Sequence, residues 1–243
     1  MRYKLYFKLN KPLKLKLNYH EDIQRFIYLL FTKENKEYAQ FLHNQGYGEI
    51  KKYKLFTFSK LYSPKRTIKN HEIIFEDMLI LNIAGIDTKF DQYLLNTLNN
   101  YTNFKLQDQN IILKKYQIFK YNNNKQIKIK LLSPIVIRKT YLEENKKKTY
   151  YFNPLEKDFT ERINNLFKKK YEAYYGITPE DITIKLVSVN EKDKYVTKYK
   201  NTYITAWHGT YLLQGKKEYL EFLYYIGLGE KTSQGFGMFE VIE

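Results

Sequence analysis

The segment GLGEKTSQGFGM near the end of the chain contains residue types that bind phosphate groups. Lys231, Thr232 and Ser233 could offer a cation, hydroxyl groups and backbone N–H groups to phosphates. A helix end followed by a β-bulge would explain Gly227 and Gly237, but it leaves the other glycines unexplained. The segment therefore predicts that something lies close against this backbone. Its glycines stand at positions 227, 229, 235 and 237.

Other common site chemistries have few candidate residues. The chain has no cysteine, which excludes disulfides, thiolate metal sites and a cysteine nucleophile. The glycine-rich segment follows a predicted helix and precedes a predicted strand, which is the reverse of the dinucleotide-binding order. We therefore expect no metal and no cofactor. The four histidines are scattered and lack the spacing of a helical metal motif: His20, His43, His71 and His208.

The composition favours a polyanionic partner. Lys and Arg number 42 against 26 Asp and Glu, a formal net charge of +16 that would attract RNA, DNA or an anionic membrane. The 25 tyrosines could stack on bases, although most of them fit equally well as strand residues. No apolar run approaches the roughly 20 residues that span a bilayer, and the start lacks a secretory signal. We therefore expect a cytoplasmic protein without a membrane span.

The first half of the chain predicts the element order β-α-β-β-α-β. Residues 3–9 alternate apolar with polar side chains, as in a half-buried strand. Apolar residues at helical spacing follow, and this helical region ends near Gly46. Asp87 is expected to cap a second helix. Further extended segments are predicted at residues 54–61, 71–81 and 111–121.

Asparagines 122–124 form the best candidate boundary, because they are polar, turn-prone and without an apolar anchor. The same order then repeats. Asp158 and Glu161 suggest a capping box at a helix that Gly176 ends, and Gly227 ends the next helix. The strands of this half are predicted at 127–139, with an interruption at Pro134, and at 181–189, 201–213 and 235–242. We therefore predict an α+β fold of two tandem ferredoxin-like (RRM-like) units, with domains at 1–123 and 124–243.

Several segments together resemble the CRISPR repeat-processing endoribonucleases, the sixth Cas family. The resemblance runs in order over nearly the whole chain, and its most specific part is the glycine-rich segment. It implies a tandem ferredoxin-like fold that binds a repeat of precursor CRISPR RNA and cuts it once without a metal ion. It also implies a 2′,3′-cyclic phosphate and a 5′-hydroxyl as product ends. The segments are KLFTFSKL, LSPIVIRK, YFNPLEKDF, TAWHGTYLL and GLGEKTSQGFGM.

The resemblance also implies catalytic residues in the N-terminal domain. The family histidine follows the first helical region, where this chain has His43. The family lysine directly before LFTFS corresponds to Lys54, and the family tyrosine in the first helix corresponds to Tyr28. The linker after the histidine is longer than expected and contains Lys51 and Lys52, so these two lysines remain alternatives for the catalytic one.

These residue types suit the implied reaction. Attack of a ribose 2′-hydroxyl on the adjacent phosphate needs a proton acceptor, a proton donor and positive charge beside the phosphate oxygens. Histidine serves as acid or base near neutral pH, lysine is a cation, and tyrosine donates or orients a hydrogen bond. The division of acid and base roles between His43 and Tyr28 stays open.

We expect RNA contacts mainly in the C-terminal domain. Gly229 and Gly235 would permit close approach of the RNA. The side chains expected to contact RNA are Lys231, Ser233, Arg138, Lys139 and Lys52. A non-cleaving module that holds repeat RNA for a CRISPR effector complex is the alternative function, and subunits of such a complex or a second copy of the chain remain open as partners. His208 fits a structural role beside Trp207 better than an RNA contact, and a membrane-surface role has only the faintly amphipathic FKKKYEAYY in its favour.

Overall fold

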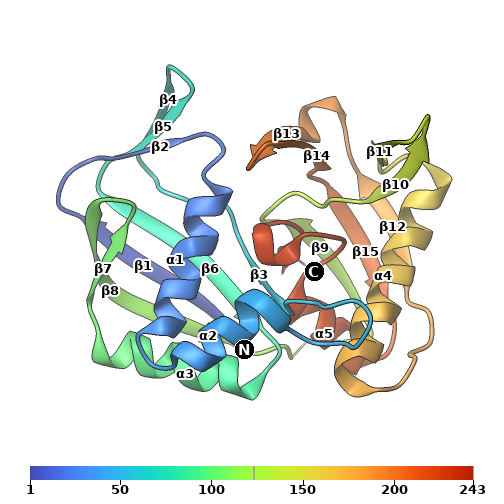
Figure 1. The fold of residues 1–243 in the computed structure, drawn as a ribbon, viewed down its shortest axis with the longest axis horizontal. Coiled ribbons are helices and arrows are strands. Elements are labelled where there is room, and N and C mark those ends of the chain that lie inside the picture. The colour runs from blue at the N-terminus through green and yellow to red at the C-terminus, as the bar shows by residue number, and fades with distance from the viewer. Residues whose placement is uncertain (123, 243) are drawn as a thin grey trace.

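The computed structural model describes residues 1–122 and 124–242. The chain forms two halves that lie side by side, and each half has an antiparallel sheet with helices packed on it (Figure 1). The two halves follow one another in sequence. The α+β class that the sequence predicts is therefore confirmed.

The first half contains a five-stranded sheet with the order β3-β6-β1-β8-β7. Its first strand, β1, is central and pairs antiparallel with β6 and β8. Apart from the added edge strand β7, this is the ferredoxin-like arrangement. The elements are β1 (Arg2–Leu9), α1 (His20–Thr32), α2 (Lys36–Gln40), the π-helix η1 (Phe41–Gln45), β3 (Phe56–Phe58), β6 (Met78–Gly85), α3 (Thr88–Asn100), β7 (Asn103–Leu106) and β8 (Gln109–Phe119).

The second half repeats that order in a four-stranded sheet, β12-β15-β9-β16. Its first strand, β9, again pairs with the third and fourth strands of the unit. The tandem ferredoxin-like fold is confirmed. The elements are β9 (Gln126–Leu131), α4 (Lys157–Tyr175), β12 (Thr183–Ser188), β15 (Thr210–Gln214), α5 (Lys217–Ile226), the 3₁₀ helix η3 (Thr232–Gln234) and β16 (Phe239–Val241).

The alternation predicted for the first strand sets its inner face. Tyr3, Leu5, Phe7 and Leu9 are all buried. The Phe7 ring packs edge-on against Phe26 of α1, with ring centroids 5.7 Å apart. Burying each such side chain contributes about 1.5–3 kcal/mol, so this row fixes α1 over the sheet.

In the part of the chain that the structure describes, three smaller β-structures lie outside the two sheets. The pair β10–β11 is almost entirely exposed, so its sequence carries no buried alternation that would reveal it. The strands of the three structures are β2 (Leu13–Lys16) with β5 (Glu72–Phe75) and β4 (Arg66–Lys69), β10 (Arg138–Glu143) with β11 (Lys146–Tyr151), and β13 (Lys194–Tyr199) with β14 (Thr202–Trp207).

The strands predicted at 71–81 and 201–213 are wrong as single elements, and the proline interruption predicted within 127–139 is a complete break between β9 and β10. Each range contains a break: β5 ends before β6, β9 ends at Leu131 before Pro134, and β14 ends before Gly209. Gly209 has a positive φ of 143°, which only glycine adopts readily. Apolar residues on both sides of a short turn therefore read as one continuous strand.

Helix ends agree with the sequence in most places. The Asp87 carboxylate accepts a hydrogen bond from the Lys89 N–H at 3.0 Å and caps α3. Gly176, with φ 72°, ends α4 as predicted. The capping box at Asp158 is wrong, because the cap of α4 is Glu156, two residues earlier, and Asp158 lies inside the first turn.

A buried arginine joins the two halves. The Arg2 guanidinium donates to the carbonyl oxygens of Phe239 at 2.5 Å and Tyr224 at 2.6 Å. It also lies 3.6 Å from the centroid of the Tyr224 ring. In addition, the Ser133 hydroxyl donates to the Phe58 carbonyl at 3.1 Å. The first strand is thereby tied to the last strand of the second sheet.

The predicted domain boundary lies between the two sheets. β8 ends at Phe119 and β9 begins at Gln126. Asn123 lies outside the described residues, so the boundary at 122–124 stays a prediction. No helix within the described part of the chain has both the length and the apolar character needed to cross a membrane.

Candidate active site

Helix α1 brings Tyr28 to the joint between the halves. One face of this helix is buried in the first core, and Tyr28 lies at the side of that face, half-buried. Gln24 is four residues earlier and therefore shares its side of the helix. The Gln24 amide donates to the Ser233 carbonyl of the glycine-rich loop at 2.7 Å. This face of α1 thus touches the second half directly.

A π-helical turn carries His43. The turn follows α2 without a break and ends at Gly46, whose φ is 71°. Such turns widen the helix by one residue and occur often at functional sites. His43 is exposed, and its ring meets the Tyr28 ring edge-on with centroids 5.1 Å apart. His43 Nδ1 lies 2.6 Å from the amide oxygen of Asn44.

Lys54 is the lysine that lines the same pocket as these two rings. It stands two residues before β3, and its Nζ is buried without a hydrogen-bond partner among the described residues. Burial lowers the pKa of Lys54 below the ordinary lysine value. Lys51 and Lys52 are exposed and line none of the pockets described here. The structure therefore brings Lys54, rather than either alternative, to His43 and Tyr28.

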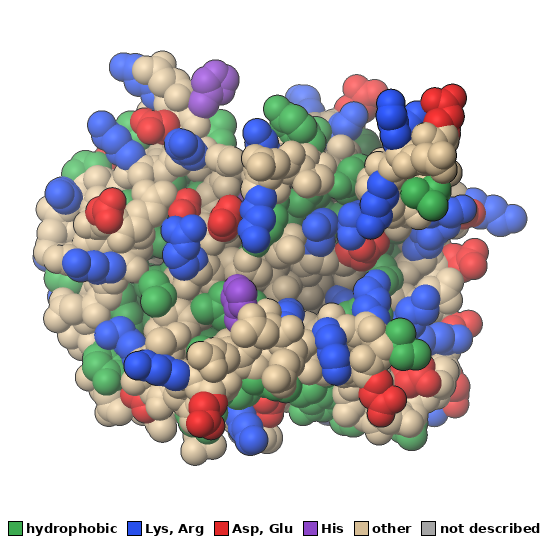
Figure 2. All heavy atoms as spheres, viewed as in Figure 1, with side chains coloured by type: hydrophobic (Ala, Val, Ile, Leu, Met, Phe, Trp, Pro, Cys, Tyr) green, Lys and Arg blue, Asp and Glu red, His purple; other side chains and the backbone are tan. Residues whose placement is uncertain are grey.

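The glycine-rich loop between α5 and β16 closes the other side of the site (Figure 1). Lys231 has a left-handed backbone with φ 58°, an uncommon conformation for a non-glycine residue. A pocket of about 330 Å³ is lined by Tyr28, His43, Lys54, Lys231 and Ser233. Residues predicted from distant parts of the sequence thus meet in one place. Figure 2 shows that the surface is hollowed between the two halves, with lysine and arginine side chains around the hollow.

The sequence analysis missed the part of the pocket formed by the β13–β14 turn. Tyr199, Lys200 and Thr202 line the pocket from this turn. The Tyr199 hydroxyl donates to the side-chain oxygen of Gln24, which joins the turn to α1. The only signal was the turn-forming pair Lys200–Asn201 between two runs of β-forming residues.

The glycines of the loop approach the chain itself. A Cβ added at Gly229 would lie 2.7 Å from the Val136 carbonyl oxygen, and one at Gly235 would lie 2.5 Å from the Phe58 ring. Both glycines also have positive φ. Packing of the loop against β3 and the segment before β10 therefore explains these glycines, and their contact with RNA stays a prediction.

The remaining predicted RNA contacts lie outside the pocket. Arg138 is half-buried and forms an ion pair with Glu230, with 2.9 Å between Arg138 Nε and the carboxylate. Lys139 is exposed on β10, and Lys52 is exposed in the linker before β3. Arg138 therefore supports the loop through Glu230, while the other two lysines are open to solvent.

Two histidines that the sequence left without a function are structural neighbours of the loop or the cleft. His20 is buried and stacks on Phe236, with ring centroids 4.7 Å apart, and its Nδ1 lies 3.0 Å from the Gln234 carbonyl oxygen. Burial lowers the pKa of His20 to about 4, so the ring is neutral near pH 7. Burial likewise lowers the pKa of His208 to about 4.

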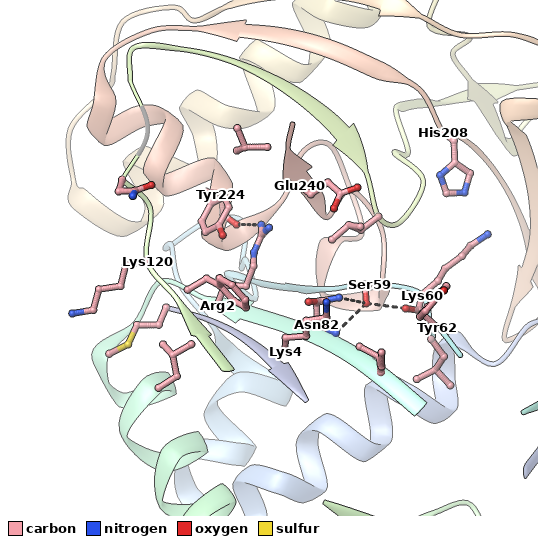
Figure 3. A pocket seen from close by; sticks show the side chains of 18 of the residues that line it. Arg2, Lys4, Ser59, Lys60, Tyr62, Asn82, Lys120, His208, Tyr224 and Glu240 are labelled. Carbon is pink, nitrogen blue, oxygen red and sulfur yellow. Dashed lines mark hydrogen bonds between the residues drawn. The ribbon is translucent and has the colours of Figure 1, made fainter. Parts of the chain in front are cut away.

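A larger cleft of about 1370 Å³ lies between the two halves (Figure 3). Lys4, Lys60 and Asn82 line it from the first half, and His208 and Glu240 from the second. Burial lowers the pKa of Lys60 to about 8. The cleft can therefore hold an anionic chain against several amino groups. Among residues 1–122 and 124–242, no three histidine or acidic side chains lie together as a metal site would require.

The fold and the site define a class of protein with two ferredoxin-like units and a basic pocket where the units meet. Two family models match this chain. The model described as CRISPR-associated protein Cas6, N-terminal, matches residues 14–117, and the one described as CRISPR associated protein Cas6, C-terminal, matches residues 113–241. The chain therefore belongs to the Cas6 family of CRISPR-associated proteins, which confirms the resemblance found in the sequence.

Individual relatives agree with this assignment. The chain is 27% identical over 244 residues to the CRISPR-associated endoribonuclease Cas6 1 of Methanocaldococcus jannaschii. This match covers 100% of this chain and 93% of that protein. The chain is also 26% identical to the CRISPR-associated endoribonuclease Cas6 of Pyrococcus furiosus, and this match covers 96% of this chain and 85% of that protein.

Solved structures support the fold over the full length. A CRISPR associated protein Cas6 superposes with a TM-score of 0.82 at 26% identity and covers 100% of this chain and 99% of its own. The product of a Cas6-related gene from Pyrococcus furiosus superposes with a TM-score of 0.85 at 24% identity. The superposition covers 100% of this chain and 98% of that structure.

Proposed function

We propose that this protein is a metal-independent endoribonuclease that binds the repeat of precursor CRISPR RNA and cuts it once. Two relatives of nearly the same length are named CRISPR-associated endoribonucleases. The observation that carries the proposal is the single pocket lined by Tyr28, His43, Lys54, Lys231 and Ser233. An imidazole, a phenol and two amino groups are the set that an RNA transesterification can use.

In the proposed reaction the ribose 2′-oxygen at the cut site attacks the adjacent phosphorus. The bond from phosphorus to the 5′-oxygen of the next nucleotide breaks. The 2′-hydroxyl proton goes to a base, and the departing 5′-oxygen takes a proton from an acid. The products are a 2′,3′-cyclic phosphate and a 5′-hydroxyl end.

His43 is suited to accept the 2′-hydroxyl proton. An amide oxygen only accepts hydrogen bonds, so the 2.6 Å contact with Asn44 Oδ1 places the imidazole proton on Nδ1. Nε2 then carries the lone pair that can accept a proton. The exposed position of the ring leaves it accessible to an RNA chain that enters the pocket.

Tyr28 and Lys54 supply the other two roles. Burial raises the pKa of Tyr28 above its ordinary value, so the phenol keeps its proton and acts as a donor. Lys54 Nζ has no hydrogen-bond partner among residues 1–122 and 124–242, and a phosphate oxygen would supply one. Its positive charge would stabilise the extra negative charge on the pentacovalent phosphorus.

The larger cleft offers a place for RNA away from the cut. Lys4, Lys60 and Lys120 line this cleft together with Glu240, although the Lys120 side chain extends away from the others and Lys60 Nζ lies 3.5 Å from the centroid of the Tyr195 ring (Figure 3). Backbone phosphates would be held there mainly by charge. The repeat would then contact both the pocket and the cleft at the joint between the two halves.

Incubation of repeat RNA with the protein in EDTA tests the proposal. We expect one cut, with a cyclic phosphate identified by mass spectrometry of the upstream product. His43→Ala should lower the single-turnover rate by at least about 100-fold, because the proton acceptor is lost. His71→Ala is the matched control, since His71 is an exposed histidine in the β4–β5 turn outside the pocket.

Two outcomes would contradict the proposal. Tight binding of repeat RNA without any product would favour the non-cleaving module of an effector complex. Cleavage by His43→Ala at the rate of the parent protein would remove His43 from the mechanism even if the RNA is cut.

A further inference from the structure

A buried lysine of α4 lies beneath the glycine-rich loop. Lys170 is only 6% exposed, and its Nζ donates to the carbonyl oxygen of Gly229 at 2.7 Å. Phe167 and Tyr171 on the same helix are buried beside it in the second core. A buried ammonium group is costly unless it has strong partners. Its placement at a loop carbonyl therefore calls for an explanation beyond packing.

The carbonyl that Lys170 holds lies two residues before the pocket-lining part of the loop, which begins at Lys231. Gly229 has φ 74°, and the next residue, Glu230, donates its N–H to the Val136 carbonyl at 2.9 Å. The Glu230 carboxylate is paired with Arg138. Lys231 follows in its left-handed conformation and reaches the pocket. The direction of the Gly229 peptide thus affects where Lys231 and Ser233 lie.

We propose that Lys170 is a positioning residue of this nuclease: its buried amino group holds the Gly229 carbonyl and thereby fixes the loop that presents Lys231 and Ser233 to the RNA. The part of this inference that concerns RNA binding rests on the proposed function. The hydrogen bond and the burial of Lys170 are properties of the free protein.

The protonation state of Lys170 makes this contact dependent on pH. Burial lowers its pKa to about 7, while Glu230 acts to raise the value and Lys51 to lower it. Phosphates bound by the loop would add negative charge nearby and favour the protonated amine. RNA binding near neutral pH should therefore take up protons at Lys170, and the affinity should fall as the pH rises above 7.

The first test uses the free protein. Lys170→Met keeps an unbranched side chain but removes the donor, and Lys169→Met changes an exposed lysine at the next position of the same helix. Amide hydrogen exchange over residues 228–236 should become faster by about tenfold or more in Lys170→Met and remain unchanged in Lys169→Met. Equal protection of the loop in both variants would overturn the proposal.

The second test uses repeat RNA with a 2′-deoxy nucleotide at the cut site. Titration calorimetry in buffers of different ionisation enthalpy measures the protons taken up per complex, in a His43→Ala background that removes the exposed imidazole. At pH 7, adding Lys170→Met should reduce the uptake by up to about 0.5 proton and raise Kd by about tenfold. Adding Lys169→Met should leave the uptake unchanged. A purely structural role of Lys170 would weaken binding without changing the proton count.

The two proposals fail in different ways. If the parent protein neither binds nor cuts repeat RNA, the proposed function falls, and the exchange experiment still tests the contact between Lys170 and the loop. If the parent protein cuts normally but Lys170→Met matches Lys169→Met in exchange, affinity and proton uptake, only the inference about Lys170 falls. Glu230→Gln gives an independent check, because loss of that carboxylate should lower the Lys170 pKa and reduce binding at pH 7.

Discussion

Among single residues, Lys54 differs from the nearby lysines in its position, because it lines the pocket and Lys51 and Lys52 do not. Three lysines follow His43 within eleven positions, and their types are identical. Only Lys54 adjoins the short strand β3, whose pairing with β6 directs it into the pocket. The sequence therefore predicted the kind of group and could not choose its position, because that choice depends on the path of an irregular linker.

Replacing Lys54 by methionine should lower the single-turnover cleavage rate by about 100-fold, since the positive charge beside the phosphate is lost. Lys52→Met is the matched control and should stay within about threefold of the parent. Quench-flow kinetics on repeat RNA measures both rates. A larger loss in Lys52→Met than in Lys54→Met would transfer the catalytic role to the exposed lysine.

The lowered pKa of Lys54 also has a pH consequence. The ammonium form is lost as pH rises through a pKa below the ordinary lysine value, so the cleavage rate should decline at a lower pH than an exposed lysine would give. In Lys54→Arg the guanidinium stays charged, and this alkaline decline should disappear. A pH–rate profile of both proteins tests this, and coincident alkaline limbs would contradict it.

Among the elements, the glycine-rich loop is defined by its fit against β3. Gly235 packs where a Cβ would lie 2.5 Å from the Phe58 ring and 2.8 Å from His20 Nδ1. The sequence identified the loop from its glycines and the sheets from their alternation. It did not predict the contact between the loop and β3, because the apolar and small residues involved look like ordinary core residues.

Gly235→Ala should destabilise the protein by about 2–4 kcal/mol, because φ is positive and the added methyl group meets a rigid ring. Gly176→Ala is the control for backbone strain alone. Its φ is 72°, nothing lies within 4 Å of its added Cβ, and about 1 kcal/mol is expected. Urea unfolding measures both values, and equal losses would show that the contact with Phe58 relaxes at no cost.

The exposed hairpins mark the limit of sequence patterns at this scale. β10 and β11 carry charged and polar residues on both faces, and β13–β14 supplies Tyr199 and Lys200 to the pocket. Strands without a buried face give no alternation to detect. β13 and β14 do bury alternate residues, among them Tyr199, Ile204 and Ala206, but the sequence prediction merged β14 with β15 and left β13 out, so the pocket wall between them was missed.

For the whole molecule, the joint between the halves depends on a residue that looked like surface charge. Arg2 directly precedes the strand predicted at residues 3–9, and nothing in the sequence singled it out, yet it is buried and donates to two carbonyl oxygens of the second half. Burial lowers its pKa to about 10, so it stays charged at neutral pH. A charged residue in an alternating strand gives no sign that a second domain will cover it.

Arg2→Met should cost about 2–4 kcal/mol of unfolding free energy, since the Tyr224 and Phe239 carbonyls lose their donor. Arg25→Met changes an exposed arginine of α1 and should cost less than about 0.5 kcal/mol. Thermal unfolding followed by calorimetry compares the two. A stability loss in Arg2→Met no larger than that in Arg25→Met would mean that Arg2 does not hold the halves together.

The net charge of +16 makes the salt dependence of RNA binding a property of the whole surface. Lys231→Ala should reduce the slope of log affinity against log salt by about 0.7–1, the share of one phosphate contact. Lys105→Ala, an exposed lysine on the edge strand β7, should leave it unchanged. An unaltered slope in Lys231→Ala would remove Lys231 from the phosphate contacts.

The loop that completes the pocket comes late in the chain, whereas Tyr28, His43 and Lys54 come early. During translation the ribosome therefore releases the imidazole, phenol and first amino group long before residues 228–236 emerge. A nascent chain at that stage has the reactive groups without the wall that orders a substrate. The pocket can therefore be complete only after the second half has been synthesised and has folded against the first.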